Sequence, residues 1–192
     1  MIDTSASPCF HGTDLGNTLL QLARAAIGER LGQPSPPDAT HDLLHQPGAT
    51  FVTLMQRGQL RGCIGTLEAH RPLAQDVREN ALAAAFRDPR FQPLVLEEFD
   101  ITAVEVSLLT SAVPMAFRDE ADFMAQLRPG VDGIVFQYGR HRSTFLPQVW
   151  ESLPEREQFM QQLKRKAGLP PNFWHAEVSI ARYEVTKWKE GR

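Results

Sequence analysis

The sequence lacks the features of a disulfide-rich protein, of a membrane protein and of a nucleic-acid-binding protein. Only two of its 192 residues are cysteines, Cys9 and Cys63, which is too few for a disulfide-stapled fold and typical of a reducing compartment. No apolar run approaches the roughly 18 residues of a membrane span, and the first ten residues do not resemble a signal peptide. The formal net charge is −3, so no basic surface predicts nucleic-acid binding. We therefore expect a cytoplasmic protein without a membrane or nucleic-acid partner.

The chain does contain enough apolar material for a core. Hydrophobic residues make up 42% and charged residues 22% of it, as in an ordinary globular protein. The length suits one domain. We expect a disordered tail over residues 1–13, which are polar and irregular, and a single domain over residues 14–192. The six histidines show no metal-ligand spacing, so no metal site is predicted.

The first half of the chain reads as a helix, a hairpin, a helix and a strand. One apolar face predicts a helix over residues 14–31, followed by a proline-rich connection over residues 33–48. Two apolar runs around an Arg-Gly turn predict a hairpin over residues 51–67. A second helix follows over residues 72–86, and alternating apolar residues predict a strand over residues 101–109.

The second half repeats this order after a short helix over residues 120–127. A hairpin is predicted over residues 131–146, then a helix with an apolar stripe up to Ala167, and a closing strand over residues 177–185. Hairpin, helix and strand thus occur twice. The sequence predicts an α+β fold in which both hairpins belong to one continuous sheet, each with its helix outside.

A short motif in the first hairpin concentrates chemistry. Residues 60–65 read Leu-Arg-Gly-Cys-Ile-Gly, a strand that carries two glycines, which weaken a strand unless something approaches closely. Side chains alternate along a strand, so Arg61 and Cys63 are predicted on one face, with Leu60 and Ile64 on the other. A cation beside a thiol favours the thiolate, which is the nucleophilic and metal-binding form.

The same motif resembles the signature of the AMMECR domain family, known in bacteria and archaea as AmmeMemoRadiSam system protein A. The likeness continues in order through Asp88-Pro89-Arg90-Phe91, residues 105–109, residues 144–149 and Lys166-Ala167-Gly168-Leu169, and covers about residues 14–187. The resemblance implies two β-rich repeats with helices around one curved, barrel-like sheet. It also implies a modification pathway shared with a Memo-like protein and a radical-SAM enzyme, although no activity is settled for the family.

The first-half candidates for catalysis are Cys63, Arg61 and Glu105. Cys63 is predicted to be a nucleophile, redox centre or ligand, or alternatively a small buried packing residue. Arg61 would supply the cation, and Glu105 would act as a general base or as the partner of Arg61, unless the two only form a structural ion pair. A substrate site is expected around these three residues. The exposed backbone of Gly62 and Gly65 and the hydroxyl of Ser107 would line it.

Three further residues are candidates for substrate binding. Arg90 could bind an anionic group bidentately; the alternative, which the turn favours, is that Asp88 caps or braces the loop. Thr144 lies on the return strand of the second hairpin, as Cys63 does in the first, and Gln148 would add a neutral hydrogen-bonding wall to a pocket between the repeats. Strand-end hydrogen bonding is the alternative for both. The sequence therefore supports either an enzyme, or part of one, that uses Cys63, or a non-catalytic module that binds a small ligand or a protein.

Overall fold

The computed structural model describes residues 13–34 and 40–191. The disordered tail predicted for residues 1–13 falls outside this part of the chain except at its last residue, and so does the centre of the proline-rich connection. The described chain divides into two compact units, which we call unit 1 (residues up to Leu109, with Thr186 onwards) and unit 2 (Thr110–Val185). The α+β class is confirmed, whereas the single-domain organisation stays a prediction.

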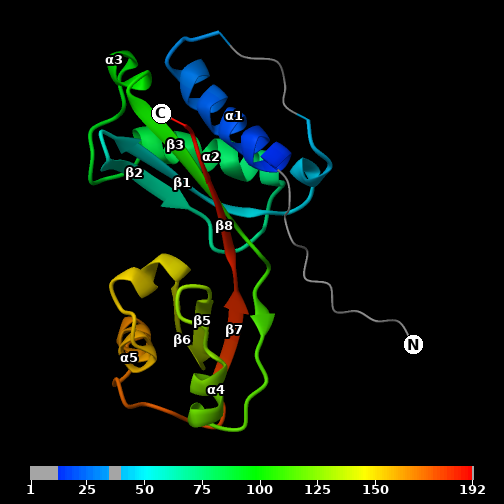
Figure 1. Cartoon of the computed structure of the whole chain (residues 1–192), viewed down its shortest axis with the longest axis vertical. Helices are drawn as coiled ribbons and strands as arrows, with labels where there is room; N and C mark the ends of the chain where they lie inside the picture. Colours follow the sequence, from blue (N-terminus) through cyan, green and yellow to red (C-terminus); the bar gives the residue numbers. More distant parts are fainter. Residues whose placement is uncertain (1–12, 35–39, 192) are drawn as a thin grey trace. The chain divides into compact units, whose positions relative to one another are not determined.

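Unit 1 is a four-stranded sheet with two long helices on one face (Figure 1). Its strands lie in the order β2-β1-β3-β8. The elements are α1 (Thr13–Arg30), η1 (Asp42–His45), β1 (Ala49–Gln56), β2 (Gln59–Gly65), α2 (Leu73–Phe86), α3 (Leu96–Phe99), β3 (Thr102–Leu109) and β8 (Val185–Lys189). Alternate strand residues point to the helices and form an aliphatic core that includes Val52, Leu54, Val104 and Val106.

Unit 2 contains a second four-stranded sheet, ordered β4-β7-β5-β6. Its elements are β4 (Val113–Pro114), α4 (Glu120–Gln126), β5 (Gly133–Tyr138), β6 (His141–Phe145), η2 (Pro147–Glu151), α5 (Arg156–Lys166) and β7 (Ser179–Tyr183). The core is aromatic: Phe123, Phe136 and Phe159 are completely buried. Trp150 stacks on Phe159 with ring centroids 3.8 Å apart and planes 4° from parallel.

The repeated element order is present, but the prediction of one continuous sheet is wrong. The hairpin β1–β2 belongs to the sheet of unit 1 and the hairpin β5–β6 to the sheet of unit 2, and neither sheet closes into a barrel within the described residues. Each hairpin buries its apolar face against helices of its own unit, so each sheet has its own core. The closing strand predicted over residues 177–185 corresponds to β7, which pairs with β5. The strand β8, which joins β3 in unit 1, was not predicted.

Candidate functional site

The strand that carries the motif contains a β-bulge at Arg61. Leu54 of β1 lies opposite Gly62, and the next residue, Met55, lies opposite Leu60, so Arg61 is an extra residue of β2. A bulge breaks the alternation of a strand and re-aims the side chain of the extra residue. The strict alternation predicted for residues 60–64 is therefore wrong at Arg61, and Leu60, predicted on the face of Ile64, is 41% exposed.

The Arg61 guanidinium pairs with the short helix α3. Its Nε and Nη2 atoms each donate to a carboxylate oxygen of Glu98 at 2.9 Å, and Nη2 also donates to the carbonyl of Gln92 at 2.9 Å. The Nη1 atom is buried and has no hydrogen-bond partner among the described residues. Of the two roles predicted for Glu105, that of partner to Arg61 is thus wrong.

Cys63 lies at one end of a polar row that crosses the sheet. It faces Thr53 of β1, which faces Glu105 of β3 on its other side, so the three side chains share one face. Thr53 Oγ1 donates to Cys63 Sγ at 3.3 Å, and Glu105 forms an ion pair with Lys187 of β8. We call Cys63, Thr53, Glu105 and Lys187 the polar row.

The polar row occupies the face of the sheet opposite the helices. Its members in β1 and β3 alternate with completely buried neighbours, among them Val52, Leu54 and Val104, that point into the core. Cys63 is part-exposed, the Glu105 side chain is 15% exposed and that of Lys187 is 45% exposed. The row therefore offers a thiol that already receives one hydrogen bond, and a carboxylate that one cation neutralises.

A second pair of side chains holds the backbone of Cys63 from the outer edge of β2. Asp88 Oδ2 accepts from the Cys63 N–H at 2.9 Å, and Arg90 Nη2 donates to the Cys63 carbonyl at 3.1 Å. Arg90 also forks onto Asp88, at 2.9 Å from Nε and 2.6 Å from Nη2. Asp88 thus braces the turn, the favoured prediction for this segment, and the Arg90 guanidinium is engaged with Asp88 while its side chain stays 53% exposed.

These ion pairs perturb the carboxyl groups next to the motif. The hydrogen bonds from Arg90 hold the pKa of Asp88 well below its usual range, against the opposing effect of burial, and the Cys63 N–H acts in the same direction as Arg90. The hydrogen bonds from Arg61 are the largest cause that lowers the pKa of Glu98 to about 2. Both carboxylates therefore stay charged at any physiological pH.

The two glycines of the motif make room for protein atoms. A Cβ at Gly62 would lie 2.2 Å from the carbonyl oxygen of Ala84, so α2 approaches β2 at this residue. A Cβ at Gly65 would lie 2.2 Å from the ring of Phe51, which covers the glycine from the face of the polar row. Ser107 is opposite Phe51 in β3 and is buried. The close approach expected at Gly62 is present, and its partner is backbone; substrate contact by these three residues stays a prediction.

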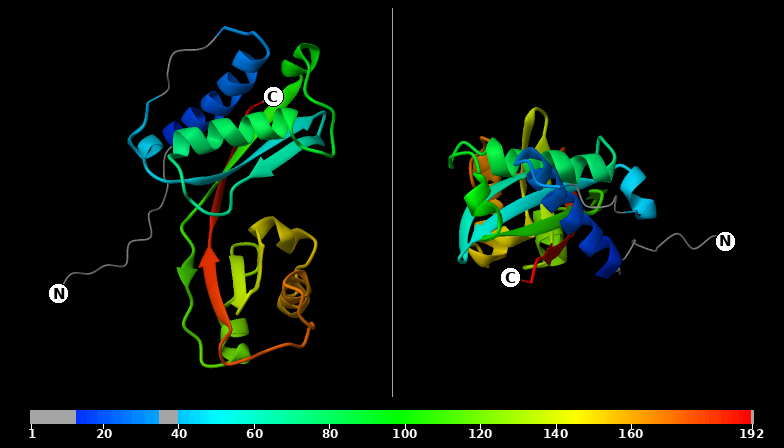
Figure 2. Two further views of the ribbon diagram at one scale, coloured as in Figure 1. Left: turned by 180° about the vertical axis from the view of Figure 1, so that it is seen from behind. Right: turned by 90° about the horizontal axis from the view of Figure 1, so that it is seen from above.

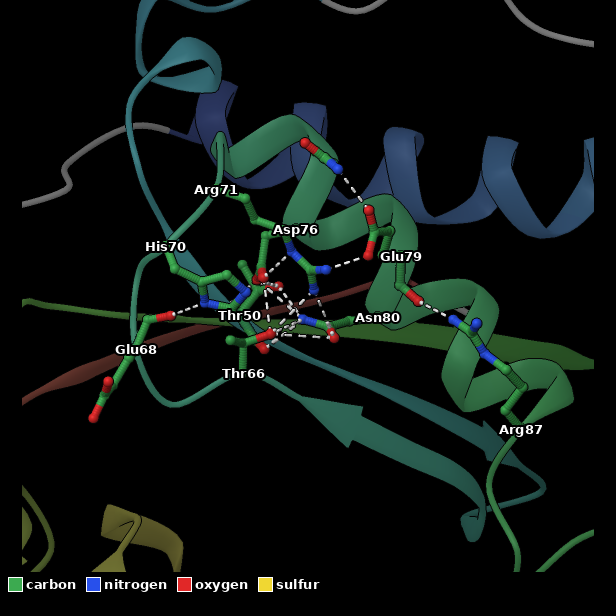
Figure 3. Close-up of polar contacts among 10 residues, drawn as sticks. Thr50, Thr66, Glu68, His70, Arg71, Asp76, Glu79, Asn80 and Arg87 are labelled. Atoms are coloured by element: carbon green, nitrogen blue, oxygen red, sulfur yellow. Dashed lines mark hydrogen bonds and ion pairs between the residues drawn. The ribbon is translucent and has the colours of Figure 1, made fainter.

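A buried polar network that the sequence did not reveal anchors the segment after the motif (Figure 3). The Asp76 side chain is completely buried and accepts hydrogen bonds from four residues, namely Thr50, Thr66, Arg71 and Asn80. The network joins β1, the β2–α2 connection and α2. The only signal in the sequence is the spacing of Asp76 and Asn80, four residues apart beside the apolar stripe of the helix.

The two candidates of the second half lie in unit 2. Thr144 of β6 hydrogen-bonds through Oγ1 to the hydroxyl of Tyr183 at 3.0 Å, and its carbonyl accepts from Lys166 Nζ at 3.0 Å. Burial raises the pKa of Tyr183. Gln148 is exposed on η2. Strand-end hydrogen bonding thus accounts for Thr144, and a pocket shared with Cys63 stays a prediction.

Within residues 13–34 and 40–191, no group of three or more His, Cys, Asp or Glu side chains is placed to hold a metal ion. The helices of the same residues include none that is long and apolar enough to cross a membrane.

The fold and the motif place the protein in a known class, that of AMMECR domains. The model of the AMMECR1 family matches residues 20–188, and the chain belongs to this family. It is 39% identical over 186 residues to a protein of Methanothermobacter thermautotrophicus, covering 92% of this chain and 95% of the relative.

Two further relatives agree with this assignment. A protein of Methanocaldococcus jannaschii is 35% identical, with 91% of this chain and 90% of the relative covered. The crystal structure of an uncharacterized protein from Pyrococcus horikoshii superposes with a TM-score of 0.77 at 33% identity, covering 92% of this chain and 91% of that one. The family resemblance inferred from the motif is therefore confirmed over nearly the whole chain.

Proposed function

We propose that the protein is a thiol-dependent component of a cytoplasmic modification pathway that also involves a Memo-like protein and a radical-SAM enzyme, with Cys63 as its reacting group. The observation that carries the proposal is the setting of the thiol. Cys63 is part-exposed and accepts a hydrogen bond from Thr53 at 3.3 Å. A donor to sulfur stabilises the thiolate, the reactive form. The two partners are proposed from the resemblance to AmmeMemoRadiSam system protein A.

In this proposal each predicted residue takes a distinct role. Cys63 loses its proton to water and adds to an electrophilic carbonyl carbon of the substrate; one S–C bond forms and the carbonyl π electrons move to oxygen. Glu105 lies two strands away, about 10 Å along the sheet at the usual strand spacing. It therefore acts as a base on the bound substrate and not on the thiol. Arg61 contributes by fixing α3 beside β2, through Glu98.

The remaining candidates are proposed as substrate contacts. Arg90 presents the exposed part of its guanidinium to an anionic group, and Gly65 and Ser107 line the face beside the polar row. Gly62 keeps β2 close to α2. Substrate contact by Thr144 and Gln148 of unit 2 stays a prediction from the sequence.

Alkylation of the folded protein tests the thiol. In a Cys9→Ser background, so that Cys63 is the single thiol, iodoacetamide labelling followed by mass spectrometry across pH 6–9 measures its reactivity. We expect Thr53→Val to slow labelling near neutral pH, because the sulfur loses its donor, and Thr53→Ser to restore it. If Cys63 labels only after denaturation, the nucleophile is excluded.

Reconstitution tests the pathway. The Memo-like and radical-SAM proteins of the same source are combined with the wild type or with Cys63→Ser, and products are followed by mass spectrometry. The proposal expects product formation with the wild type and its loss with Cys63→Ser at unchanged stability. Equal products from both proteins would remove the catalytic role and leave the pathway assignment intact.

A non-catalytic binding module is the second candidate, and one observation favours it. The charges of Arg61 and Glu105 are already balanced by Glu98 and Lys187, as in a structural network. In this case Cys63 is a packing residue, and the face of the polar row binds a small ligand or a partner. Cys63→Ala would then retain both stability and complex formation with the two pathway proteins.

A further inference from the structure

The outer edge of β2 is a place where another chain could add to the sheet. β2 has one neighbour in the strand order β2-β1-β3-β8, so its other side is an edge. Edge strands present N–H and C=O groups that can pair with a second strand. In an antiparallel strand both groups of a residue point the same way, and those of Cys63 point to the edge, where they meet Asp88 and Arg90.

Asp88 and Arg90 occupy these two groups as a neighbouring strand would. The carboxylate accepts from the Cys63 N–H at 2.9 Å, and the guanidinium donates to its C=O at 3.1 Å. Two hydrogen bonds join the acceptor and the donor to each other, at 2.9 and 2.6 Å. The Asp88 side chain is only 1% exposed, so the carboxylate is fixed against the strand.

The chain around this pair is also held in place. The Arg90 N–H donates to Asp88 Oδ1 at 3.1 Å, and the Phe91 N–H to the Asp88 carbonyl at 3.1 Å. Further along the same segment, Gln92 and Glu98 bind the Arg61 side chain of β2. The segment between α2 and α3 thus runs beside β2, as both side views show (Figures 1 and 2).

We propose that the Asp88–Arg90 pair is a cap that closes the edge of β2 at Cys63 and keeps a second copy of this chain from adding to the sheet there. The second copy is the relevant partner because the same edge on two copies is self-complementary about a two-fold axis. Antiparallel pairing of two uncapped edges would bring the two Cys63 residues close together. The inference is independent of any reaction at the thiol.

Removal of the cap tests the proposal. The double variant Asp88→Ala/Arg90→Ala is compared with the wild type in a Cys9→Ser background, by light scattering after gel filtration and by a short bis-maleimide that joins two thiols. The matched control is Arg118→Ala/Asp122→Ala, which removes the same residue types from an exposed pair in unit 2. We expect a linked Cys63–Cys63 dimer from the cap variant, and none from the wild type or the control.

Two results would overturn the cap. One is a cap variant that keeps a wild-type urea transition yet shows the same mass and no link. The other is a wild type that links as readily as the variant, because its edge would then be open already.

A milder variant keeps the test decisive if the double variant does not fold. Asp88→Asn retains the shape of the side chain and removes its charge, which weakens its bonds to Arg90 and to the Cys63 N–H. In dilute solution we expect the Cys63 amide hydrogen to exchange at least about tenfold faster, from the usual worth of a hydrogen bond to a charged group. An unchanged exchange rate would show that the cap does not hold this edge.

Discussion

Unit 1 and unit 2 bring a helix against the second strand of a hairpin in different ways. In unit 1 the residue before Cys63 is Gly62, where a Cβ would lie 2.2 Å from the carbonyl oxygen of Ala84 in α2. In unit 2 the residue before Thr144 is Ser143, whose hydroxyl donates to the carbonyl of Leu163 in α5 at 2.7 Å. In both units a strand residue lies against a helix carbonyl. Unit 1 has a glycine without a side chain at this position, and unit 2 has a serine that hydrogen-bonds to the carbonyl.

The hydrophobic cores of the two units also differ in the size of their side chains. The completely buried hydrophobic side chains of unit 1 are aliphatic, whereas unit 2 buries three phenylalanines and stacks Trp150 on Phe159. Small side chains let α2 lie close to the sheet, and aromatic rings fill a wider space. Two units with the same order of elements can therefore be built around different core residues.

The largest expected effects come from a completely buried aspartate in each unit, Asp76 in unit 1 and Asp132 in unit 2. Asp76 accepts from Thr50, Thr66, Arg71 and Asn80, and Asp132 from Arg128. Replacing Asp76 by alanine leaves the buried donors of Thr50 and Asn80 without this acceptor, and we expect a loss of about 3–5 kcal/mol in the free energy of unfolding. Asp132→Ala should cost less, about 1–3 kcal/mol, because the Arg128 side chain is 46% exposed and can be solvated. Urea unfolding measures the loss, and hydrogen exchange locates it.

The pattern of hydrogen exchange tests whether each buried aspartate stabilises only its own unit. The described partners of each aspartate lie in its own unit, so amide protection should fall mainly between residues 49 and 109 for Asp76→Ala and between residues 113 and 183 for Asp132→Ala. Asp122→Ala, at an exposed pair, should change little. An equal loss in both units from Asp76→Ala would contradict the division.

The next effect compares the two strand–helix contacts directly. Gly62→Ala should cost about 2–3 kcal/mol, because the new Cβ meets rigid backbone, and Gly62→Val more. Ser143→Ala should cost about 1–2 kcal/mol, the worth of one buried hydrogen bond. Thermal and urea unfolding give both values.

Gly58→Ala is the control for this comparison. Gly58 has a φ of +77° and no heavy atom near its would-be Cβ, so alanine should add only backbone strain, about 1–2 kcal/mol. If Gly62→Ala and Gly58→Ala lowered the free energy of unfolding equally, the close approach of α2 to Gly62 would not contribute to stability.

The smallest expected effect is the acid response of Glu98. Arg61 lowers the pKa of Glu98 from its usual 4.5 to about 2, so the folded state binds this proton less readily than the unfolded state. The stabilisation is fully present above pH 4.5 and is lost as the pH falls towards 2. We expect Glu98→Gln to lose about 1–2 kcal/mol at pH 7 and to approach the wild type at pH 2.

Urea midpoints at several pH values between 2 and 7 measure this response. Glu97→Gln is the matched control, since Glu97 is exposed on the same short helix. A constant difference between Glu98→Gln and the wild type over the whole range would contradict the role of the Arg61 pair.

The sequence predicted most local elements of the fold because each has a local signal. The helices over residues 14–31 and 72–86 agree with α1 and α2 within a residue or so, and the turns at Gly58 and Gly139 both have positive φ values, +77° and +54°. Alternation also placed Glu105 and Ser107 on one face of β3 correctly. The candidate site was predicted only in part: Cys63 and Glu105 share a face, but Thr53 and Lys187 were missed.

What the sequence determined by itself was the family, the order of elements and the position of the motif, since these depend on neighbouring residues and on periodicity. The tertiary structure decided which strands form which sheet, the bulge that turns Arg61 towards Glu98, and the pairing of Glu105 with Lys187. Partners 37 and 82 residues apart (98 − 61 and 187 − 105) leave no trace in a local pattern. They are selected when burial of each sheet against its own helices fixes the register, and only then does the motif acquire its surroundings.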